Sequence, residues 1–322
     1  MHDLAKNQVL SIFSLLYFPL ILTILYPERN KIEDIYFYAG NVRHSWLHIA
    51  YVTTNRGWIN VASSAVSILN RSSISCHFHV FFSEPLNQSD NIFPAIQEYY
   101  KGRALFNISI LPYNEVAGKF PYPKGFWNFW TPFIFARVLI IDIVDCDYLL
   151  YLDTDVYGCG DVKEVSFINL GNSLMAGVPD AAPWHSYIGK EHLDTLNLTD
   201  KTYFNSGVIY MNIQELRKCD FVNKALKRWA QKQTFYPDQD LLNYLVGDRR
   251  MMLDYRFNMH WVSRPGECVL RHFNHKKITH PVVKYGHEDY NYHFDAFNLV
   301  TKLYLQTFKK EPKSYLHDTQ PS

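Results

Sequence analysis

The stretch Tyr148–Gly160, YLLYLDTDVYGCG, decides the fold of this chain. Its apolar run Tyr148–Leu152 is typical of a strand that is buried on both faces of a parallel sheet. Asp153 and Asp155 follow the run, with Thr154 between them, and two glycines then turn the chain. In an open α/β sheet, ligands bind just beyond the carboxyl ends of the strands. Two carboxylates there suit a divalent cation shared with a substrate phosphate, and the alternative is an Asp-rich turn that binds nothing.

Length and composition indicate a globular protein. The sequence has 322 residues, of which 48% are hydrophobic and 20% are charged, so it can build a large core. The formal net charge of +1 gives no reason to expect nucleic acid as a partner. Aromatic residues make up 16% of the sequence, a content that suits either a sugar-binding groove or a Tyr- and Phe-rich core.

An uncharged segment near the start of the sequence, Val9–Tyr26, predicts a membrane anchor. A helix over this segment would be about 27 Å long, which is just enough to cross a bilayer core. No small-residue cleavage site follows it, which favours an uncleaved signal anchor over a cleaved signal peptide or a buried helix. Basic residues lie on both sides of the segment, so they do not fix its orientation.

The expected domain organisation follows from this segment. Residues 1–8 form a cytoplasmic tail, residues 9–26 a transmembrane signal anchor, and residues 27–45 a polar stem. Residues 46–300 form the globular domain, and residues 301–322 form a C-terminal surface helix and tail. A single α/β domain of this size is ordinary.

Four potential N-glycosylation sites indicate a lumenal environment. They are the Asn-x-Ser/Thr triplets at Asn70, Asn87, Asn107 and Asn197. Together with the anchor, they predict a single-pass type II protein of the Golgi or endoplasmic reticulum membrane, without deciding between the two. The five cysteines have no metal-type spacing, so one or two disulfides are open in an oxidising lumen and their pairing is not assigned.

From residue 46 the hydrophobic pattern alternates between strands and helices, which predicts an α/β fold with a mostly parallel sheet and right-handed crossovers. The expected strands are His48–Thr54, His77–Phe82, Leu105–Leu111, Tyr148–Leu152, Ser173–Val178 and Tyr203–Asn212. The expected helices are Trp58–Leu69, Phe93–Tyr100, Pro132–Ile143, Gln214–Gln231 and Pro237–Val246. No internal repeat is present.

Some polar residues in this pattern need an explanation. Arg137 lies in an otherwise apolar helix, where it is either paired with an acid or placed at the surface. Gly207 lies inside an apolar strand, which indicates a close approach by another group. Asp238 and Gln239 lie in the first turn of a predicted helix, where helix-start chemistry alone would also favour an acid.

Four stretches, in this order, resemble glycosyltransferase family 8. They are Ala136-Arg137, LLYLDTDV at Leu149–Val156, FNSGVIYMN at Phe204–Asn212 and PDQDLLN at Pro237–Asn243. The resemblance covers roughly Trp46 to His287 and implies a GT-A type, Rossmann-like fold with a mixed, mostly parallel sheet over residues 46–300. The segment Asn128–Ile140, NFWTPFIFARVLI, together with the anchor and the sequons, is similar to the animal lumenal xylosyltransferase branch.

The resemblance implies a retaining transferase that uses a UDP-sugar donor and a divalent cation, Mn²⁺ or Mg²⁺. By resemblance, Asp153 and Asp155 hold the metal against the donor diphosphate. The family adds a C-terminal histidine in an H-x-x-G-x-x-K-P-W-like segment. The best match is VLRHFNHKK at Val269–Lys277, which places His272 in the ligand position but lacks the Gly-x-x-Lys-Pro-Trp portion. The other candidates are His275, His280 and His287.

The same resemblance implies a set of donor contacts. The first predicted strand ends without the carboxylates that contact uridine in the family, although Thr and Asn side chains can hydrogen-bond a base or ribose. The implied donor-binding residues are Thr53, Thr54, Asn55, Arg137, Asp153, Thr154, Asp155, Asp180, Asn205, Ser206, Gly207, Asp238 and Gln239.

Gln239 matches the side chain nearest the anomeric carbon, and this constrains the mechanism. Double displacement needs a carboxylate nucleophile at that point, whereas the position carries a neutral amide. The hypothesis is therefore front-side transfer, with Asp238 as a covalent nucleophile the alternative.

The expected donors are UDP-xylose, UDP-glucose and UDP-galactose, in that order, and the expected acceptor is a glycan on a glycoprotein. The acceptor would bind loops at Pro121–Trp130 and Ala181–Thr199, with Trp127, Trp184 and His185 as stacking candidates. Two alternatives are a catalytically silent family member that binds glycans or a partner protein, and a nucleotide-sugar hydrolase. The sequence leaves the oligomeric state open.

Overall fold

The structure is a computed structural model that describes residues 46–88, 91–121, 131–180, 193–194, 196, 198, 203–259, 268–273 and 291–309. All of them belong to the compact unit Phe37–Ser322. The expected anchor Val9–Tyr26, the stem and most of the two expected acceptor loops lie outside the described residues. Among the described helices, none is long and apolar enough to cross a membrane.

Strands and helices alternate along the first half of the described chain, as the pattern predicts. The strands are β1 (Trp46–Thr53), β2 (Ser75–Phe82), β3 (Ala104–Ile110), β4 (Tyr148–Leu152), β5 (Val156–Gly158), β6 (Met175–Pro179), β7 (Phe204–Asn212), β8 (Arg250–Met252) and β9 (Leu270–His272). The α-helices are α2 (Trp58–Leu69), α3 (Phe93–Tyr99), α4 (Tyr113–Lys119), α5 (Ala136–Leu139), α8 (Ile213–Lys218), α9 (Phe221–Gln231), α10 (Pro237–Val246) and α11 (Asn291–Phe308). The 3₁₀ helices are η2 (Asn55–Gly57), η4 (Pro132–Phe135), η5 (Ile140–Asp142), η6 (Val162–Phe167) and η7 (Tyr255–Phe257).

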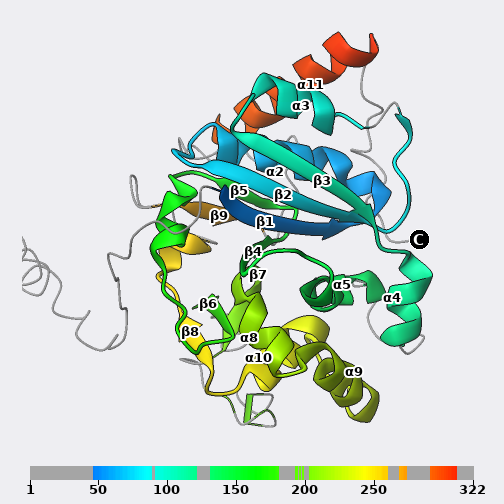
Figure 1. Cartoon of the computed structure of the whole chain (residues 1–322), viewed down its shortest axis with the longest axis vertical. Helices are drawn as coiled ribbons and strands as arrows, with labels where there is room; N and C mark the ends of the chain where they lie inside the picture. Colours follow the sequence, from blue (N-terminus) through cyan, green and yellow to red (C-terminus); the bar gives the residue numbers. More distant parts are fainter. Residues whose placement is uncertain are drawn as a thin grey trace, which may run out of the picture. The chain divides into compact units, whose positions relative to one another are not determined.

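A seven-stranded sheet, in the order β3-β2-β1-β4-β7-β6-β8, forms the centre of the fold (Figure 1). Strand β2 is parallel to β1 and β3, and β1 is also parallel to β4. Strand β7 is antiparallel to both β4 and β6, and β8 is parallel to β6. This confirms the expected mixed, mostly parallel sheet. A second, two-stranded antiparallel sheet joins β5 to β9.

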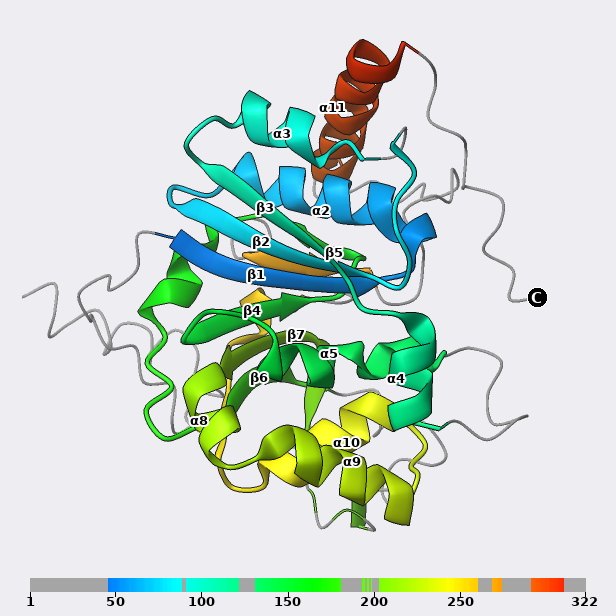
Figure 2. The ribbon, with the colours of Figure 1, turned by 45° about the vertical axis from the view of Figure 1, so that its right-hand side comes forward.

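The core lies on both faces of the large sheet, because alternate side chains of a strand point to opposite faces. In β1, Leu47, Ile49 and Tyr51 pack into the cluster that includes α2 and α11, whereas Ala50 and Val52 pack into the cluster that includes α5, α9 and α10. Figure 2 shows these two groups of helices on either side of the sheet. Burying each large aliphatic side chain contributes about 1.5–3 kcal/mol.

Two helix predictions are wrong in detail. The segment expected as one helix over Pro132–Ile143 consists of η4, α5 and η5, because aromatic and β-branched side chains crowd a regular helix. The helix expected over Gln214–Gln231 is broken into α8 and α9, and Asp220 at the break has a left-handed φ of 55°. An aspartate tolerates this conformation better than most residues.

The C-terminal helix differs from the expected surface helix. Helix α11 crosses the boundary expected at residue 300, and its residues Ala296, Val300, Leu303 and Tyr304 are buried against the core. The Tyr304 ring stacks on Trp58 of α2 with ring centroids 5.4 Å apart. The helix therefore belongs to the globular domain.

One disulfide, unassigned by the sequence, joins Cys159 to Cys268. It ties the turn after β5 to the segment that leads into β9. A Cβ atom at Gly160 would lie 2.4 Å from the Cys268 carbonyl oxygen, so this close approach requires glycine. The remaining cysteines, Cys76, Cys146 and Cys219, are not in disulfides.

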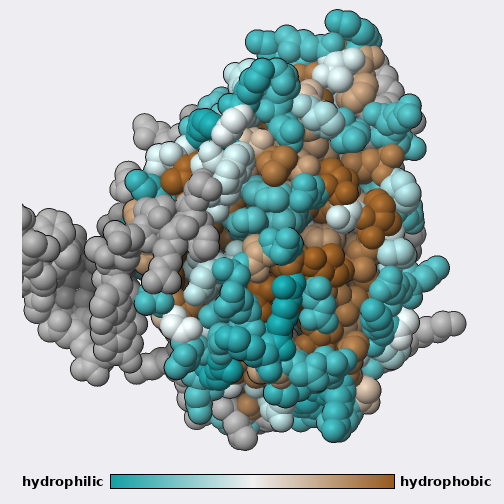
Figure 3. Space-filling view, viewed as in Figure 1, coloured by the Kyte–Doolittle hydropathy of each residue, from teal (hydrophilic) through white to brown (hydrophobic). Residues whose placement is uncertain are grey.

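On the face shown in Figure 3, hydrophobic residues gather near the middle and hydrophilic residues dominate elsewhere. The asparagines of three potential glycosylation sites, Asn70, Asn87 and Asn107, are exposed. They are therefore accessible to a glycan. The fourth, Asn197, lies outside the described residues.

Candidate active site

The two carboxylates predicted from the strand end lie at the carboxyl edge of the sheet. Asp153 follows β4 directly, and its backbone N–H donates to the Gly207 carbonyl of β7 at 2.8 Å. Asp155 lies two residues further on, just before β5, and its carbonyl accepts from the Phe273 N–H at 3.0 Å. The backbones on both sides of this short connection are thus fixed to neighbouring strands.

His272, the last residue of β9, completes a group of possible metal ligands. Ligand atoms of Asp153, Asp155 and His272 all lie within 4.8 Å of one another. The His272 Nε2 atom lies 3.4 Å from Asp155 Oδ1 and 4.0 Å from Asp153 Oδ2, and the histidine is 3% exposed. The structure therefore brings the three predicted metal ligands together.

A chain of amide side chains fixes the orientation of the His272 ring. The Asn205 Nδ2 donates to Asp180 Oδ2 at 3.0 Å, while Asn205 Oδ1 accepts from the Gly207 N–H at 2.9 Å. That oxygen also accepts from Asn258 Nδ2 at 2.9 Å, which leaves Asn258 Oδ1 to face His272 Nδ1 at 3.0 Å. Because Asn258 Oδ1 can only accept, Nδ1 carries the proton that it donates, so Nε2, which faces the carboxylates, is the nitrogen that has the lone pair when the ring is neutral.

The electrostatics of these three groups fit a cation. Burial raises the pKa of Asp153 above its ordinary value, although the Arg137 guanidinium opposes the rise. Burial also acts to raise the pKa of Asp155 and to lower that of His272, but their mutual attraction outweighs both effects, so the pKa of Asp155 is lowered and that of His272 is raised. Positive charge beside the two carboxylates, either a proton on the ring or a metal ion, is therefore favourable. A divalent cation with one nitrogen and two oxygen ligands meets this requirement.

Gly207 makes room for the predicted metal ligand His272. A Cβ atom at this position would lie 2.2 Å from His272 Cε1 and 2.9 Å from Nε2. Such contacts are far inside the normal separation of about 3.5–4.0 Å for carbon atoms. The close approach that the sequence predicts at Gly207 is confirmed, and the approaching group is the His272 ring.

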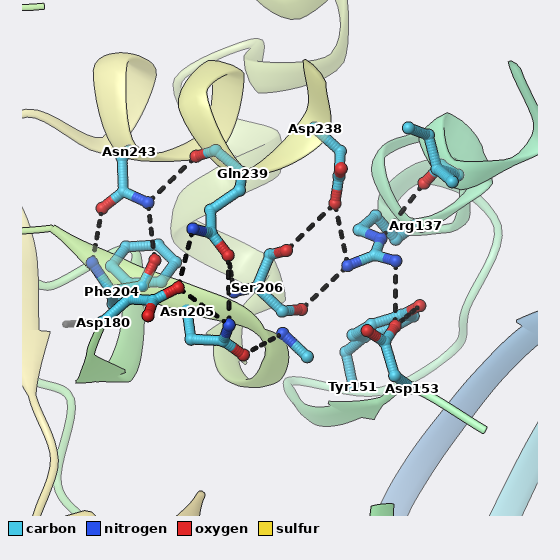
Figure 4. Close-up of polar contacts among 12 residues, drawn as sticks. Arg137, Tyr151, Asp153, Asp180, Phe204, Asn205, Ser206, Asp238, Gln239 and Asn243 are labelled. Atoms are coloured by element: carbon cyan, nitrogen blue, oxygen red, sulfur yellow. Dashed lines mark hydrogen bonds and ion pairs between the residues drawn. The ribbon is translucent and has the colours of Figure 1, made fainter. Parts of the chain in front are cut away.

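Arg137 of α5 lies between two carboxylates, as Figure 4 shows. Its Nη2 contacts Asp153 Oδ1 and its Nη1 contacts Asp238 Oδ2, each at 2.9 Å. Nη1 also donates to the Ser206 carbonyl at 2.9 Å and Nε to the Ile134 carbonyl at 3.1 Å. Arginine has five N–H donors, and four are directed at protein groups here. The guanidinium therefore fixes Asp153 and Asp238, and among the described residues one N–H is left for the contact with the nucleotide-sugar that the resemblance implies.

Gln239 is equally constrained. Its Oε1 accepts from the Ser206 N–H at 2.9 Å and from Asn205 Nδ2 at 3.3 Å, and its Nε2 donates to Asp180 Oδ2 at 3.0 Å. The Ser206 N–H can only donate, and an ionised Asp180 carboxylate can only accept. The side-chain amide of Gln239 therefore has one possible orientation. Asp180, Asn205 and Gln239 thus form one polar group, placed by three different elements.

Some functional positions were not predicted from the sequence. Asn258 orients His272, and Tyr151 donates through its hydroxyl to Asp153 Oδ1 at 2.8 Å. Asn243 of α10 bonds both the N–H and the carbonyl of Phe204, at 2.9 and 2.8 Å, and so holds the Gln239 helix against β7. The position of Asn243 in the PDQDLLN stretch was the one available signal.

The end of β1 lies at the same carboxyl edge of the sheet, next to β4. The polar contacts described there are local. The Thr54 carbonyl accepts from the Gly57 N–H at 2.9 Å, the Thr53 carbonyl accepts from the Ser83 N–H at 3.1 Å, and Asn55 Nδ2 donates to Glu84 at 3.3 Å. The side chains of the expected uridine-binding segment therefore do not join the Asp153–His272 network among the described residues.

Residues 48–283 match the family described as Glycosyl transferase family 8. The chain belongs to this family. A curated relative, the lipopolysaccharide 1,2-glucosyltransferase of Escherichia coli strain K12, is 28% identical over 153 residues, which are 46% of this chain and 45% of the relative. The lipopolysaccharide glucosyltransferase WaaO of the same strain is 27% identical over 246 residues, 73% of this chain and 70% of WaaO. The chain thus spans less than half the length of the first relative.

Solved structures support the fold of this family-8 chain. The galactosyltransferase LgtC, in complex with donor and acceptor sugar analogs, aligns with a TM-score of 0.64 and 19% identity over 84% of this chain and 99% of LgtC. The apo structure of the bifunctional glycosyltransferase WbbM aligns with a TM-score of 0.66 and 14% identity over 82% of this chain and 52% of WbbM. At such identities the likeness shows the mixed α/β, GT-A-like fold alone.

The structure of this family-8 member thus brings most of the predicted site residues close together. Asp153, Asp155 and His272 form one group, and Asp180, Asn205 and Gln239 form another, linked to it through Asn258. Ser206, Gly207, Arg137 and Asp238 lie between them. Thr154 lies in the connection between the two carboxylates, Asp153 and Asp155. The alternative histidines His275, His280 and His287, and the aromatic candidates Trp127, Trp184 and His185, lie outside the described residues.

Proposed function

We propose that this family-8 chain transfers a sugar from a UDP-sugar to a glycan hydroxyl, with retention of configuration and dependence on a divalent cation. The observation that carries the proposal is the convergence of Asp153, Asp155 and His272 within 4.8 Å, beside a buried polar group that contains Asp180 and Gln239. A metal–diphosphate site next to a hydroxyl-binding site is what transfer from a nucleotide sugar requires. Both lie at the carboxyl edge of the sheet, where ligands of open α/β folds bind.

A divalent cation would be held by one oxygen each of Asp153 and Asp155 and by Nε2 of His272. When bound, it supplies positive charge that stabilises the diphosphate as it leaves. Asp153 Oδ1 is already engaged by Arg137 and Tyr151, at 2.9 and 2.8 Å, so its Oδ2 is the oxygen on the side of His272. The site thus offers defined ligand atoms.

The sugar would bind beside Asp180, Asn205 and Gln239. Buried carboxylate and amide groups recognise hydroxyls by hydrogen bonds and reject ligands that leave them unpaired. All three side chains are at most 8% exposed, and their mutual bonds orient them before a ligand binds. Preorganisation of this kind lowers the free-energy cost of binding.

Front-side transfer is the mechanism that we favour, with the acceptor hydroxyl attacking on the face from which UDP leaves and its proton passing to the departing phosphate. Asp238 Oδ2 is engaged by Arg137 at 2.9 Å and by the Ser206 hydroxyl at 3.1 Å, which makes it a weak nucleophile. Gln239 is neutral and cannot form a glycosyl ester. Detection of a glycosyl adduct on Asp238 by mass spectrometry, after rapid quenching with donor alone, would refute the front-side mechanism.

Donor, acceptor and location complete the proposal. The candidate donors are UDP-xylose, UDP-glucose and UDP-galactose, and the names of the relatives, glucosyltransferases and a galactosyltransferase, support the two hexoses. The proposed acceptor is a glycan on a glycoprotein. The apolar segment Val9–Tyr26 and the exposed Asn70, Asn87 and Asn107 support a type II protein of the Golgi or endoplasmic reticulum membrane.

The test uses the full chain in detergent, with Mn²⁺ and each of the three UDP-sugars. UDP release is measured with and without simple glycosides, and proton NMR of the product gives its anomeric configuration. The Asp153→Asn, Asp155→Asn double variant should lose release, whereas Asp145→Asn, a change at an exposed carboxylate before β4, should keep it.

Three other results would contradict the proposal. Release from every donor that is faster without any glycoside indicates a hydrolase. Binding of UDP and Mn²⁺ without turnover on any tested acceptor indicates a silent family member. An inverted product excludes a retaining mechanism.

A further inference from the structure

A second group of metal-ligand side chains lies on the large sheet, away from Asp153. His48 of β1 and His77 of β2 are register partners, and His79 lies two residues beyond His77 on the same face of the sheet. Cys146 lies two residues before the start of β4, the other neighbour of β1. Three adjacent parts of the fold therefore contribute a histidine or a cysteine to one place.

The ligand atoms in this group are close together. His48 Nδ1 and His79 Nε2 are 2.9 Å apart, and one ligand atom each of His48, His79 and Cys146 lie within 4.8 Å of one another. In a tetrahedral zinc site with bonds of about 2.0–2.1 Å to nitrogen and 2.3 Å to sulfur, the ligand atoms are about 3.3–3.6 Å apart. Small side-chain movements are enough to reach that geometry.

The surroundings favour neutral imidazoles, which are the metal-binding form of histidine. His79 is 6% exposed, and burial, reinforced by His77 and His48, lowers its pKa to about 3. The His77 ring stacks on His79 with centroids 4.3 Å apart, and its Nε2 is buried without a hydrogen-bond partner in the part of the chain that the structure describes. A third imidazole with a buried nitrogen thus lies beside the group.

This group is separate from the proposed active site. Cys146 precedes β4 and Asp153 follows it, so the two positions are about 20 Å apart along an extended strand. Among the described residues, these two groups are the places where three or more potential metal ligands meet. The ligand types also differ, because nitrogen and sulfur ligands select zinc-like ions, whereas carboxylates suit Mn²⁺ and Mg²⁺.

We propose that His48, His79 and Cys146 bind a divalent transition metal of the zinc class, with His77 or a water molecule as the fourth ligand. The metal has a structural role, since it links β1, β2 and the segment that leads into β4. Binding replaces the thiol proton of Cys146. The proton shared between His48 and His79 moves to the other nitrogen of one ring, so the site releases one proton for each metal ion bound.

Cobalt(II) is the probe that reports directly on this ligand set. We expect the full chain to bind one Co²⁺ at this site, with the visible bands of tetrahedral cobalt and a near-ultraviolet sulfur-to-cobalt charge-transfer band. Asp153, Asp155 and His272 offer only oxygen and nitrogen ligands, so metal that they bind cannot give that band. Zn²⁺ should displace the cobalt, abolish the absorption and raise Tm.

Two independent variants and one matched control complete the test. Cys146→Ser and His48→Asn should each lose the charge-transfer band and reduce the zinc-dependent rise in Tm by the share that this site contributes. Cys219→Ser, a change at another partly buried free thiol, should keep both. No charge-transfer band at saturating Co²⁺ in the unmodified chain, or a band that persists in Cys146→Ser, would overturn the proposal.

Discussion

Replacing Gly207 by alanine should place a methyl group in the space that the His272 ring occupies. The added Cβ would lie 2.2 Å from Cε1, 2.8 Å from Nδ1 and 2.9 Å from Nε2 of the ring. With a normal carbon contact of about 3.5 Å, the ring has to move by about 1.3 Å. The ring is 3% exposed and bonded to Asn258, so this movement breaks existing contacts.

The size of the effect follows from how precisely metal ligands are placed. Metal–ligand distances in working sites agree with ideal values to about 0.2 Å, so a displacement of about 1.3 Å removes His272 from the site. Losses of ligand orientation typically weaken metal binding by about 10–100-fold. We expect a loss of at least that size for Gly207→Ala, which corresponds to about 1.4–2.8 kcal/mol.

The assay is a titration of the full chain with Mn²⁺ in the presence of UDP, followed by the electron paramagnetic resonance signal of free Mn²⁺. Gly118→Ala is the matched control, because a Cβ at Gly118 has no atom of the described residues within 4 Å. A His272→Ala background tests the cause, since Gly207→Ala should add little once the ring is absent. Mn²⁺ affinity unchanged in a folded Gly207→Ala chain would refute the steric argument.

Three further changes test other parts of the site and fold. Arg137→Met should lower the free energy of unfolding by about 3–5 kcal/mol, because it leaves the two carboxylates without their shared cation. If urea denaturation shows that the free energy of unfolding falls by less than about 1 kcal/mol, the pairing is disproved. Asn258→Leu should weaken Mn²⁺ binding about 10–100-fold, because the His272 ring loses the acceptor that orients it, and an unchanged titration would show that another group orients the ring. Cys159→Ser combined with Cys268→Ser removes a disulfide that closes a loop with a sequence separation of 109. The double change should lower the free energy of unfolding by about 2–5 kcal/mol in the same denaturation measurement. Unchanged stability would mean that the disulfide does not constrain the unfolded chain.

The parts of the site that were predictable have short-range patterns. The run Tyr148–Leu152 is apolar and is followed at once by Asp153 and Asp155. A few neighbouring residues therefore indicate both the strand and the carboxylates at its end. The expected close approach at Gly207 is a similar case, because an interior strand glycine is itself unusual. Neither pattern shows which group approaches or which atoms face each other.

The parts that were not predictable depend on long-range contacts. Asn258 contacts His272 directly and is itself oriented by Asn205, which is 53 residues away in the sequence, and nothing in its own surroundings marks it as functional. The irregular 3₁₀ and α turns around Arg137 also escaped prediction, because hydrophobic spacing does not distinguish a crowded turn from a regular helix. The break at Asp220 depends on a single left-handed residue.

By itself, the sequence determined the class of this protein: the alternating α/β pattern, the carboxylates at a strand end and the ordered stretches that resemble family 8. These are local properties, because periodicity and residue type act over a few neighbouring positions. Only the tertiary structure decided that Arg137 is held mainly by Asp153 and Asp238, and that a relay of amides sets the tautomer of His272. It also brought His48, His79 and Cys146 together. Hydrogen bonds and steric contacts have ranges of a few ångströms, so they act only after folding has made distant residues neighbours.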